Sequence, residues 1–308
     1  FGVPQGSVLG PLLFLIYIND LPNISNILKF YLFADDTNIF FQSHSLDILQ
    51  RTINRELKKL SIWLNANRLA LNISKTNFVI FAAKNKPLKN VLAIEQKDHV
   101  KYLGVLVDSK LSFKAHIASI SKKISKTTGL MSKVRHYANS DILKMLYNSL
   151  IYPYLLYATP IWGNADNIHT HSLLIIQKKA MRIIANKDIY YNQNHAYEPS
   201  SPLFKKFNSL TIHDIFKVET LKFVYDCIRK LNPQQFHSYF KYPTNNLNTA
   251  SNRNNNLSIP MVRTVTYGLK YIKYSGSVLW NNLTEADRKK PSKKTFASNI
   301  KNKFIQNY

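Results

Sequence analysis

The sequence of 308 residues contains one cysteine, few acidic side chains and no long apolar run. The single cysteine, Cys227, excludes a disulfide framework and a zinc site built from cysteines. The longest apolar run, residues 12–18, is much shorter than the roughly 20 residues that a membrane span needs. These absences exclude a disulfide-rich secreted domain and a membrane-spanning protein, and they are consistent with a reducing compartment.

Acidic groups are scarce beside basic ones, with 17 Asp and Glu against 42 Lys and Arg. Residues 1–110 hold 13 basic and 8 acidic side chains, whereas residues 111–308 hold 29 and 9. A positive field of this kind attracts phosphate, and nucleic acid is the commonest polyanion. The excess of lysine also fits a genome whose base composition favours Lys and Asn codons, so charge alone leaves both interpretations open.

The first 110 residues alternate between short strands and helices. Proline fits a first helical turn, so a helix is predicted from Pro11 to about residue 20. Leucine and isoleucine at helical spacing predict a second, amphipathic helix over residues 45–66. Strands are predicted at 30–34, 37–41, 69–72 and 78–82, and residues 102–107 form a strand or a hairpin turned at Gly104.

Beyond about residue 112 the pattern predicts mostly helix. Helices are expected at 113–137, 140–158, 171–186, 211–231 and 293–307. Ser140 is a plausible N-cap, and Thr211 followed by Asp214 indicates another helix start. The Asn-rich residues 242–258 are expected to form a loose loop.

Asp35 and Asp36 are the clearest candidates for chemistry. Adjacent carboxylates on a turn between two strands concentrate negative charge, and Mg²⁺ binds carboxylates together with substrate phosphates. Two-metal phosphoryl transfer needs such oxygens. Aspartate is also a common turn residue, so an isolated Asp-Asp pair more often marks only a turn.

The surrounding residues resemble the reverse transcriptases of non-LTR retrotransposons, in particular the jockey-like group of LINE elements. Four blocks occur in the order of that family's motifs B, C, D and E. They are residues 2–7 with 9–14 (GVPQGS and LGPLLF), residues 31–37 (YLFADDT), residues 63–76 and residues 102–105 (YLGV). Less specific likeness continues through residues 151–163 and 177–184, and through residues 279–283 with Ser292 and Phe296.

The resemblance implies a role for each matching residue. Asp35 would coordinate catalytic Mg²⁺ (or Mn²⁺), with Asp36 in a lesser role, and Phe33 and Ala34 would lie beside the primer end. Gln5 and Gly6 would meet the incoming nucleotide and the template base. Their alternative is an ordinary turn before a helix.

Three other groups carry weaker assignments. Lys75 could neutralise phosphate, although a solvated lysine on a turn is slightly favoured. Residues matching a primer grip, or forming a plain hairpin, are Tyr102, Leu103 and Gly104. Residues that could follow the backbone of a template–primer duplex, or form a solvated helix face, are Lys122, Lys123, Lys126, Lys133 and Arg135.

The expected fold is α+β: an incomplete palm at 1–110, a helical thumb at 111–195 and a basic carboxy-terminal region at 196–308. The implied reaction adds deoxynucleotides from their triphosphates to a DNA 3′ end while copying RNA, in the nucleus and cytoplasm. Because the sequence begins inside motif B, the motif A aspartate and the fingers are expected upstream. We predict that this chain alone does not polymerise.

Two alternatives stay open. The chain could derive from a decayed or co-opted element that only binds RNA or DNA. It could also belong to another templated polymerase, such as an intron-encoded reverse transcriptase, although the later blocks argue against this.

Overall fold

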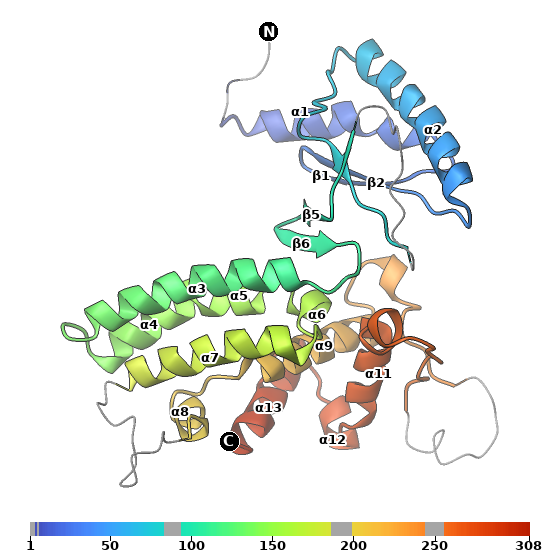
Figure 1. Ribbon diagram of the computed structural model, residues 1–308. Coiled ribbons are helices and arrows are strands. Elements are labelled where there is room, and N and C mark those ends of the chain that lie inside the picture. Colours follow the sequence, from blue (N-terminus) through green and yellow to red (C-terminus); the bar gives the residue numbers. More distant parts are fainter. Residues whose placement is uncertain (1–3, 5, 83–93, 186–198, 244–255) are drawn as a thin grey trace. The chain divides into compact units, whose positions relative to one another are not determined.

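The computed structural model describes residue 4 and residues 6–82, 94–185, 199–243 and 256–308. It divides into two compact units, Phe1–Val100 and Lys101–Tyr308, and each is considered by itself. The described residues combine helices with three two-stranded sheets, in agreement with the α+β expectation (Figure 1). Within these residues no helix combines the length and apolar character needed to cross a membrane.

The first unit contains two long helices around a small hairpin. Its elements are α1 (Leu9–Ile18), the 3₁₀ turn η1 (Leu21–Ile24), β1 (Lys29–Phe33), β2 (Asp36–Phe40), α2 (Leu46–Ala66), β3 (Asn77–Phe78) and β4 (Glu95–Gln96). The strand expected at 69–72 is absent, and the one expected at 78–82 is reduced to β3. The side chain and backbone of Asn72 bind residues 74–76 instead, which holds a turn there.

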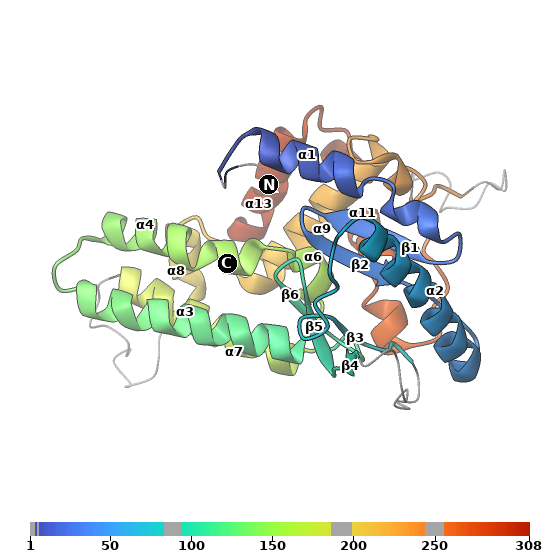
Figure 2. The ribbon, with the colours of Figure 1, turned by 90° about the horizontal axis from the view of Figure 1, so that it is seen from above.

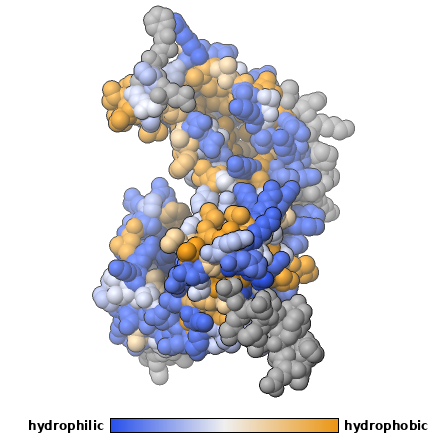
Figure 3. Space-filling model, turned by 90° about the vertical axis from the view of Figure 1, so that its left-hand side faces the viewer, coloured by the Kyte–Doolittle hydropathy of each residue, from blue (hydrophilic) through white to orange (hydrophobic). Residues whose placement is uncertain are grey.

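The core of the first unit is small. Among its described residues, Ile18, Leu21 and Leu60 form the buried cluster, and partly buried side chains of the hairpin and α2 pack around them. α1 is apolar around its whole circumference, yet it exposes Leu9, Leu12, Leu13, Leu15, Ile16 and Tyr17. Figure 3 shows apolar surface in orange among the hydrophilic surface. A helix apolar on all sides is usually buried, so α1 has more apolar surface than this unit covers.

The second unit begins with a hairpin and continues as packed helices. The hairpin strands are β5 (His99–Tyr102), in which the boundary between the units falls, and β6 (Val105–Asp108). The first group of helices is α3 (Lys114–Val134), α4 (Ser140–Leu150), α5 (Tyr152–Leu156), α6 (Thr159–Trp162) and α7 (Asn167–Ile184). α3 and α7 lie side by side (Figures 1 and 2).

The remaining elements follow around α9 (Ile212–Ile228), against which α11 and α13 pack directly. They are α8 (Ser201–Lys206), η2 (Gln234–Phe236), the π-helical η3 (Val265–Leu269), α11 (Ile272–Asn281), α12 (Glu285–Arg288) and α13 (Lys293–Gln306). One buried cluster joins side chains from α3 through α13. The described helices before and after the predicted boundary at residue 195 therefore share one hydrophobic core.

Several helix ends differ from expectation. The N-cap of α4 is Asn139, whose side chain accepts the amide of Ile142, and Ser140 is the first helical residue. The helix expected at 140–158 breaks at Ile151, and a short helix with Pro153 in its first turn follows. The expected Asn-rich loop lies mostly outside the described residues.

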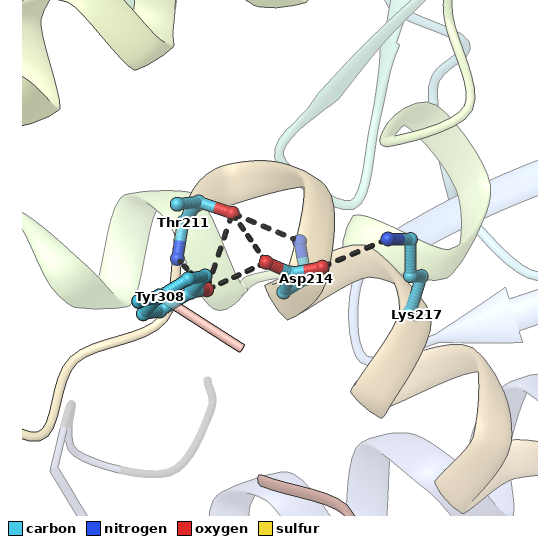
Figure 4. Close-up of polar contacts among 4 residues, drawn as sticks. All are labelled: Thr211, Asp214, Lys217 and Tyr308. Atoms are coloured by element: carbon cyan, nitrogen blue, oxygen red, sulfur yellow. Dashed lines mark hydrogen bonds and ion pairs between the residues drawn. The ribbon is translucent and has the colours of Figure 1, made fainter. Parts of the chain in front are cut away.

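The predicted start of α9 is confirmed (Figure 4). Thr211 is the N-cap and hydrogen bonds Asp214, with 2.8 Å between Oγ1 and Oδ2. The same carboxylate accepts the Tyr308 hydroxyl at 2.5 Å and the Lys217 ammonium at 2.8 Å. Burial raises the pKa of Asp214, but these three hydrogen bonds outweigh burial and hold its pKa below the usual value. The cap thus also fastens the end of the chain to α9.

Candidate active site

The Asp35-Asp36 pair lies where the sequence predicts it, at the tip of a tight hairpin. β1 and β2 are antiparallel with Phe33 opposite Asp36, so Ala34 and Asp35 alone form the turn. Ala34 has a φ of 49°, and two-residue hairpins need such a positive φ in the turn. Both aspartates are exposed. The hairpin therefore presents two adjacent carboxylates to solvent on a short, hydrogen-bonded support.

The two faces of this hairpin differ. Phe30, Leu32 and Ile39 pack against the small core of the first unit. The opposite face carries Tyr31 and Phe33, which are 54% and 64% exposed. Directly paired residues of antiparallel strands share a face, so Asp36 lies on the same side as Phe33. The structure thus brings Phe33, Ala34, Asp35 and Asp36 together at one exposed tip.

This pair fits part of a magnesium site. Mg²⁺ is commonly bound by one or two carboxylates, with waters and substrate phosphates completing its octahedron. In the part of the chain that the structure describes, no three side chains of His, Cys, Asp or Glu gather into a metal-binding group. Asp35 and Asp36 can therefore supply the protein carboxylates, while the other ligands must come from elsewhere.

The residues expected to meet the nucleotide are only partly described. Gln5 lies outside the described residues. Gly6 forms the turn before α1 with a φ of 90°, a conformation that strongly favours glycine. Lys75 is exposed on the turn that Asn72 organises, and no described contact links it to either aspartate. The structure does not bring Lys75 to the carboxylate pair.

The predicted primer-grip residues form a second hairpin. Leu103 and Gly104 have φ values of 43° and 85°, the two positive values of a type I′ turn. The Tyr157 hydroxyl donates a hydrogen bond of 2.6 Å to the carbonyl of Leu103. The hairpin turn and β6 therefore belong to the second unit, whereas Asp35 and Asp36 belong to the first.

The basic residues predicted on α3 divide into two groups. Lys122, Lys126 and Lys133 are exposed and recur at spacings of four and seven residues, so they share one side of the helix; we call them the lysine stripe. Lys123 lies toward α5, with its ammonium 5.3 Å from the centre of the Tyr154 ring. Arg135 is half-buried at the end of α3 and is not part of the stripe.

Neither α3 nor α7 contains an acidic residue. Elsewhere in this unit, six acids pair with lysines within hydrogen-bonding distance. Among the described residues, no acid pairs with the lysine stripe. Sequence reasoning did not assign α7, although it adds Lys178, Lys179 and Arg182 to the same pair of helices. The absence of Asp and Glu from the sequence of α7 was the signal that could have identified this helix as positively charged. The two neighbouring helices thus carry positive charge and supply no acid that could neutralise the lysine stripe.

His116 is a second residue that sequence reasoning did not assign. Its side chain is buried between β6 and the helices, and its Nδ1 accepts the amide of Leu106 at 3.3 Å. Burial, with a smaller effect from the charge of Lys123, lowers the pKa of His116 to about 4. The imidazole is therefore neutral near pH 7 and serves as a hydrogen-bond acceptor for the second hairpin.

Comparison of the sequence with known proteins shows which family it resembles. Residues 1–107 match the family described as "Reverse transcriptase (RNA-dependent DNA polymerase)". The chain is 30% identical over 264 residues to a probable RNA-directed DNA polymerase from transposon X-element of Drosophila melanogaster, covering 82% of this chain and 27% of that protein.

Two other relatives from Drosophila melanogaster each match 61% of the chain. The RNA-directed DNA polymerase from mobile element jockey is 28% identical, and a probable one from transposon BS is 29% identical. The alignments cover 22% and 23% of those proteins, so the chain spans about a quarter of the length of these relatives. No solved structure matches the chain. Residues 1–107 therefore belong to the reverse transcriptase family, and the chain is related over most of its length to the RNA-directed DNA polymerases of jockey-like non-LTR retrotransposons.

Proposed function

We propose that this chain supplies a metal-binding hairpin and a nucleic-acid surface to an RNA-directed DNA polymerase of a non-LTR retrotransposon. The observation that carries the proposal is the exposed turn of Asp35 and Asp36, inside the region that matches the family. The intact enzyme would copy an RNA template by adding deoxynucleotides to the 3′ end of a DNA primer. Asp35 and Asp36 would contribute carboxylates to hold Mg²⁺ (or Mn²⁺), which would supply positive charge to the attacking oxygen and the leaving pyrophosphate of a two-metal phosphoryl transfer.

The roles of the residues follow from their positions. Asp35 and Asp36 would hold metal at the hairpin tip, because their carboxylates are adjacent and open to solvent. Phe33 would contact the nucleic acid beside them with its exposed ring. The lysine stripe, supported by the acid-free α7, would contact the phosphates of the template–primer duplex without reading base sequence.

Metal binding provides the direct test. Titration of the chain with Mn²⁺ and a deoxynucleoside triphosphate, followed by proton relaxation of water, measures the affinity for the ternary complex. Asp35→Asn should weaken that affinity about ten-fold or more, since a lost charge-assisted contact is worth about 1.5–3 kcal/mol. Asp98→Asn, at an exposed acid of the same unit, is the control and should change nothing. Equal affinities for all three proteins would remove Asp35 from the metal site.

We also propose that the chain alone does not extend a primer, because no third metal-binding side chain joins the pair among the described residues. A DNA primer on an RNA template, incubated with Mg²⁺ and all four deoxynucleotides, tests this. Robust extension by the purified chain would contradict it. A non-catalytic nucleic-acid-binding role remains the second candidate, and the positive surface of α3 and α7 favours it. Duplex binding that is unchanged by Asp35→Asn and unaffected by divalent metal would support that alternative.

A further inference from the structure

The second hairpin is attached to the helices through its turn. The Tyr157 hydroxyl reaches the carbonyl of Leu103, 54 residues earlier in the sequence. Its ring edge also covers the turn: a Cβ added to Gly104 would lie 3.4 Å from Cε1 of Tyr157. Tyr157 is itself 56% exposed, so this contact lies at the surface rather than in the core.

The buried Trp162 holds the backbone of Tyr157 in place. The indole of Trp162, which is fully buried, donates a hydrogen bond of 2.8 Å to the carbonyl of Tyr157. The following residue, Ala158, has a φ of 53°, which turns the chain sharply between α5 and α6. The backbone of Tyr157 is therefore fixed in place. Only rotation about the side-chain bonds of Tyr157 could move its hydroxyl relative to the hairpin turn.

A second attachment holds the strand after the turn. The His116 imidazole accepts the amide of Leu106, and its ring meets the Trp162 indole edge to face with centroids 5.5 Å apart. Both attachments thus converge on one buried tryptophan. With the turn held by Tyr157 and the strand held by His116, the hairpin is fixed to the helices at two points, by side chains 54 and 10 residues away from their partners in the sequence.

We propose that Tyr157 is a positioning residue that sets the place of the Leu103–Gly104 turn against the primer strand. This inference rests on the proposed function, since it takes the hairpin as the surface that meets the primer. Tyr157 acts through the turn and does not contact the reacting atoms. Loss of its hydroxyl should free the turn while leaving the helices and their phosphate contacts in place.

Tyr157→Phe isolates the hydroxyl because it keeps the ring and its packing. The matched control is Tyr154→Phe in α5, the helix that ends just before Tyr157, because the contact of the Tyr154 ring with Lys123 does not need the hydroxyl. Amide hydrogen exchange of residues 103–108 is the first measurement. Exchange should become about five-fold faster in Tyr157→Phe, as expected for one lost hydrogen bond, and stay unchanged in Tyr154→Phe. Equal exchange in all three proteins would overturn the proposed anchoring.

The second measurement uses a DNA primer with a photoreactive thymidine near its 3′ end, annealed to an RNA template. Crosslinking to residues 101–108 should fall about five-fold in Tyr157→Phe, while overall duplex affinity changes by less than about two-fold, because phosphate contacts dominate binding. A merely structural tyrosine would lower affinity and crosslinking together, and that result would refute a positioning role.

The outcomes separate the two proposals. If the wild-type chain does not bind the duplex, or binds it without crosslinks to the hairpin, then the proposed primer contact fails, and the positioning role fails with it. If the wild-type chain crosslinks through the hairpin and Tyr157→Phe does so equally, only the role of Tyr157 is refuted.

Discussion

Acidification should destabilise the second unit in part through the imidazole of His116. The side chain is 5% exposed, and its Nδ1 must stay unprotonated to accept the amide of Leu106. Burial, aided by the charge of Lys123, lowers its pKa from 6.5 to about 4. Between these values the unfolded chain binds a proton at this imidazole and the folded chain does not. The stability that His116 contributes is therefore complete above pH 6.5 and falls as the pH drops, levelling off below about pH 4.

The size of this effect follows from the pKa difference. Each unit of difference corresponds to about 1.4 kcal/mol, so wild-type protein should lose about 3 kcal/mol across the window through this group. Other groups titrate in the same range, so the comparison must be with a variant. His116→Gln keeps an oxygen acceptor for the Leu106 amide and cannot take up a proton near neutral pH.

Urea unfolding at a series of pH values, followed by circular dichroism, measures the difference. The gap between the unfolding free energies of wild type and His116→Gln should shrink, or reverse in sign, by about 3 kcal/mol from pH 7 to pH 4. His136→Gln, at an exposed histidine just after α3, is the control variant, and its curve should run parallel to that of wild type. If the curve of His116→Gln is also parallel to wild type, His116 is not held neutral by its surroundings.

Three further predictions concern the core, the charge and the hairpin tip. Gln177→Leu removes three buried hydrogen bonds that join α4, α7 and the start of α9, and it should cost about 3 kcal/mol in urea unfolding. Replacing all three residues of the lysine stripe by glutamine should weaken the salt dependence of duplex binding. The slope of log affinity against log salt, measured by fluorescence anisotropy, should become less negative by about 3. Ala34→Gly should leave stability unchanged or raise it by up to about 1 kcal/mol, because it relieves a left-handed alanine. In contrast, Ala118→Gly in α3 should cost about 1 kcal/mol in the same unfolding assay.

The sequence predicted those elements whose pattern is local. Apolar residues at helical spacing indicated α2, and the structure has it at Leu46–Ala66. The Thr211–Asp214 pair located the start of α9, because a side-chain N-cap is encoded within four residues. The strand expected at 69–72 was wrong because its apolar residues form no ladder and the Asn72 turn provides the local hydrogen bonds instead.

The candidate site could likewise be predicted only where its residues are close together in the sequence. Phe33, Ala34, Asp35 and Asp36 are contiguous, so one hairpin was enough to bring them together. Tyr157 and the turn that it holds are 54 residues apart, and no periodicity links them. The positive surface likewise depends on α3 and α7 lying side by side, which is a result of packing that neither sequence shows by itself.

Several residues other than glycine have a positive φ, and three of them end helices in the same way. Arg68, Asn208 and Lys230 each follow a helix by two positions and share one hydrogen bond pattern. In each case the amide of the next residue bonds a carbonyl five residues back, at 2.8 to 2.9 Å. This is the Schellman ending, in which a left-handed residue satisfies the last carbonyls of the helix. The positive φ of these three residues thus has a structural purpose.

Ala34 and Leu103 have no such explanation, because each occupies the first turn position of a two-residue hairpin. Glycine, asparagine or aspartate would adopt that conformation more easily, and an ordinary L-residue there costs about 1–2 kcal/mol. Departures from local preference persist where the surrounding structure or a function compensates for them, and they gather at functional sites. These two hairpins carry the aspartate pair and the turn held by Tyr157. The strained alanine and leucine thus lie in the two turns for which we propose metal and primer binding, while Leu111, Phe113 and Ala158 adopt the same conformation outside both turns.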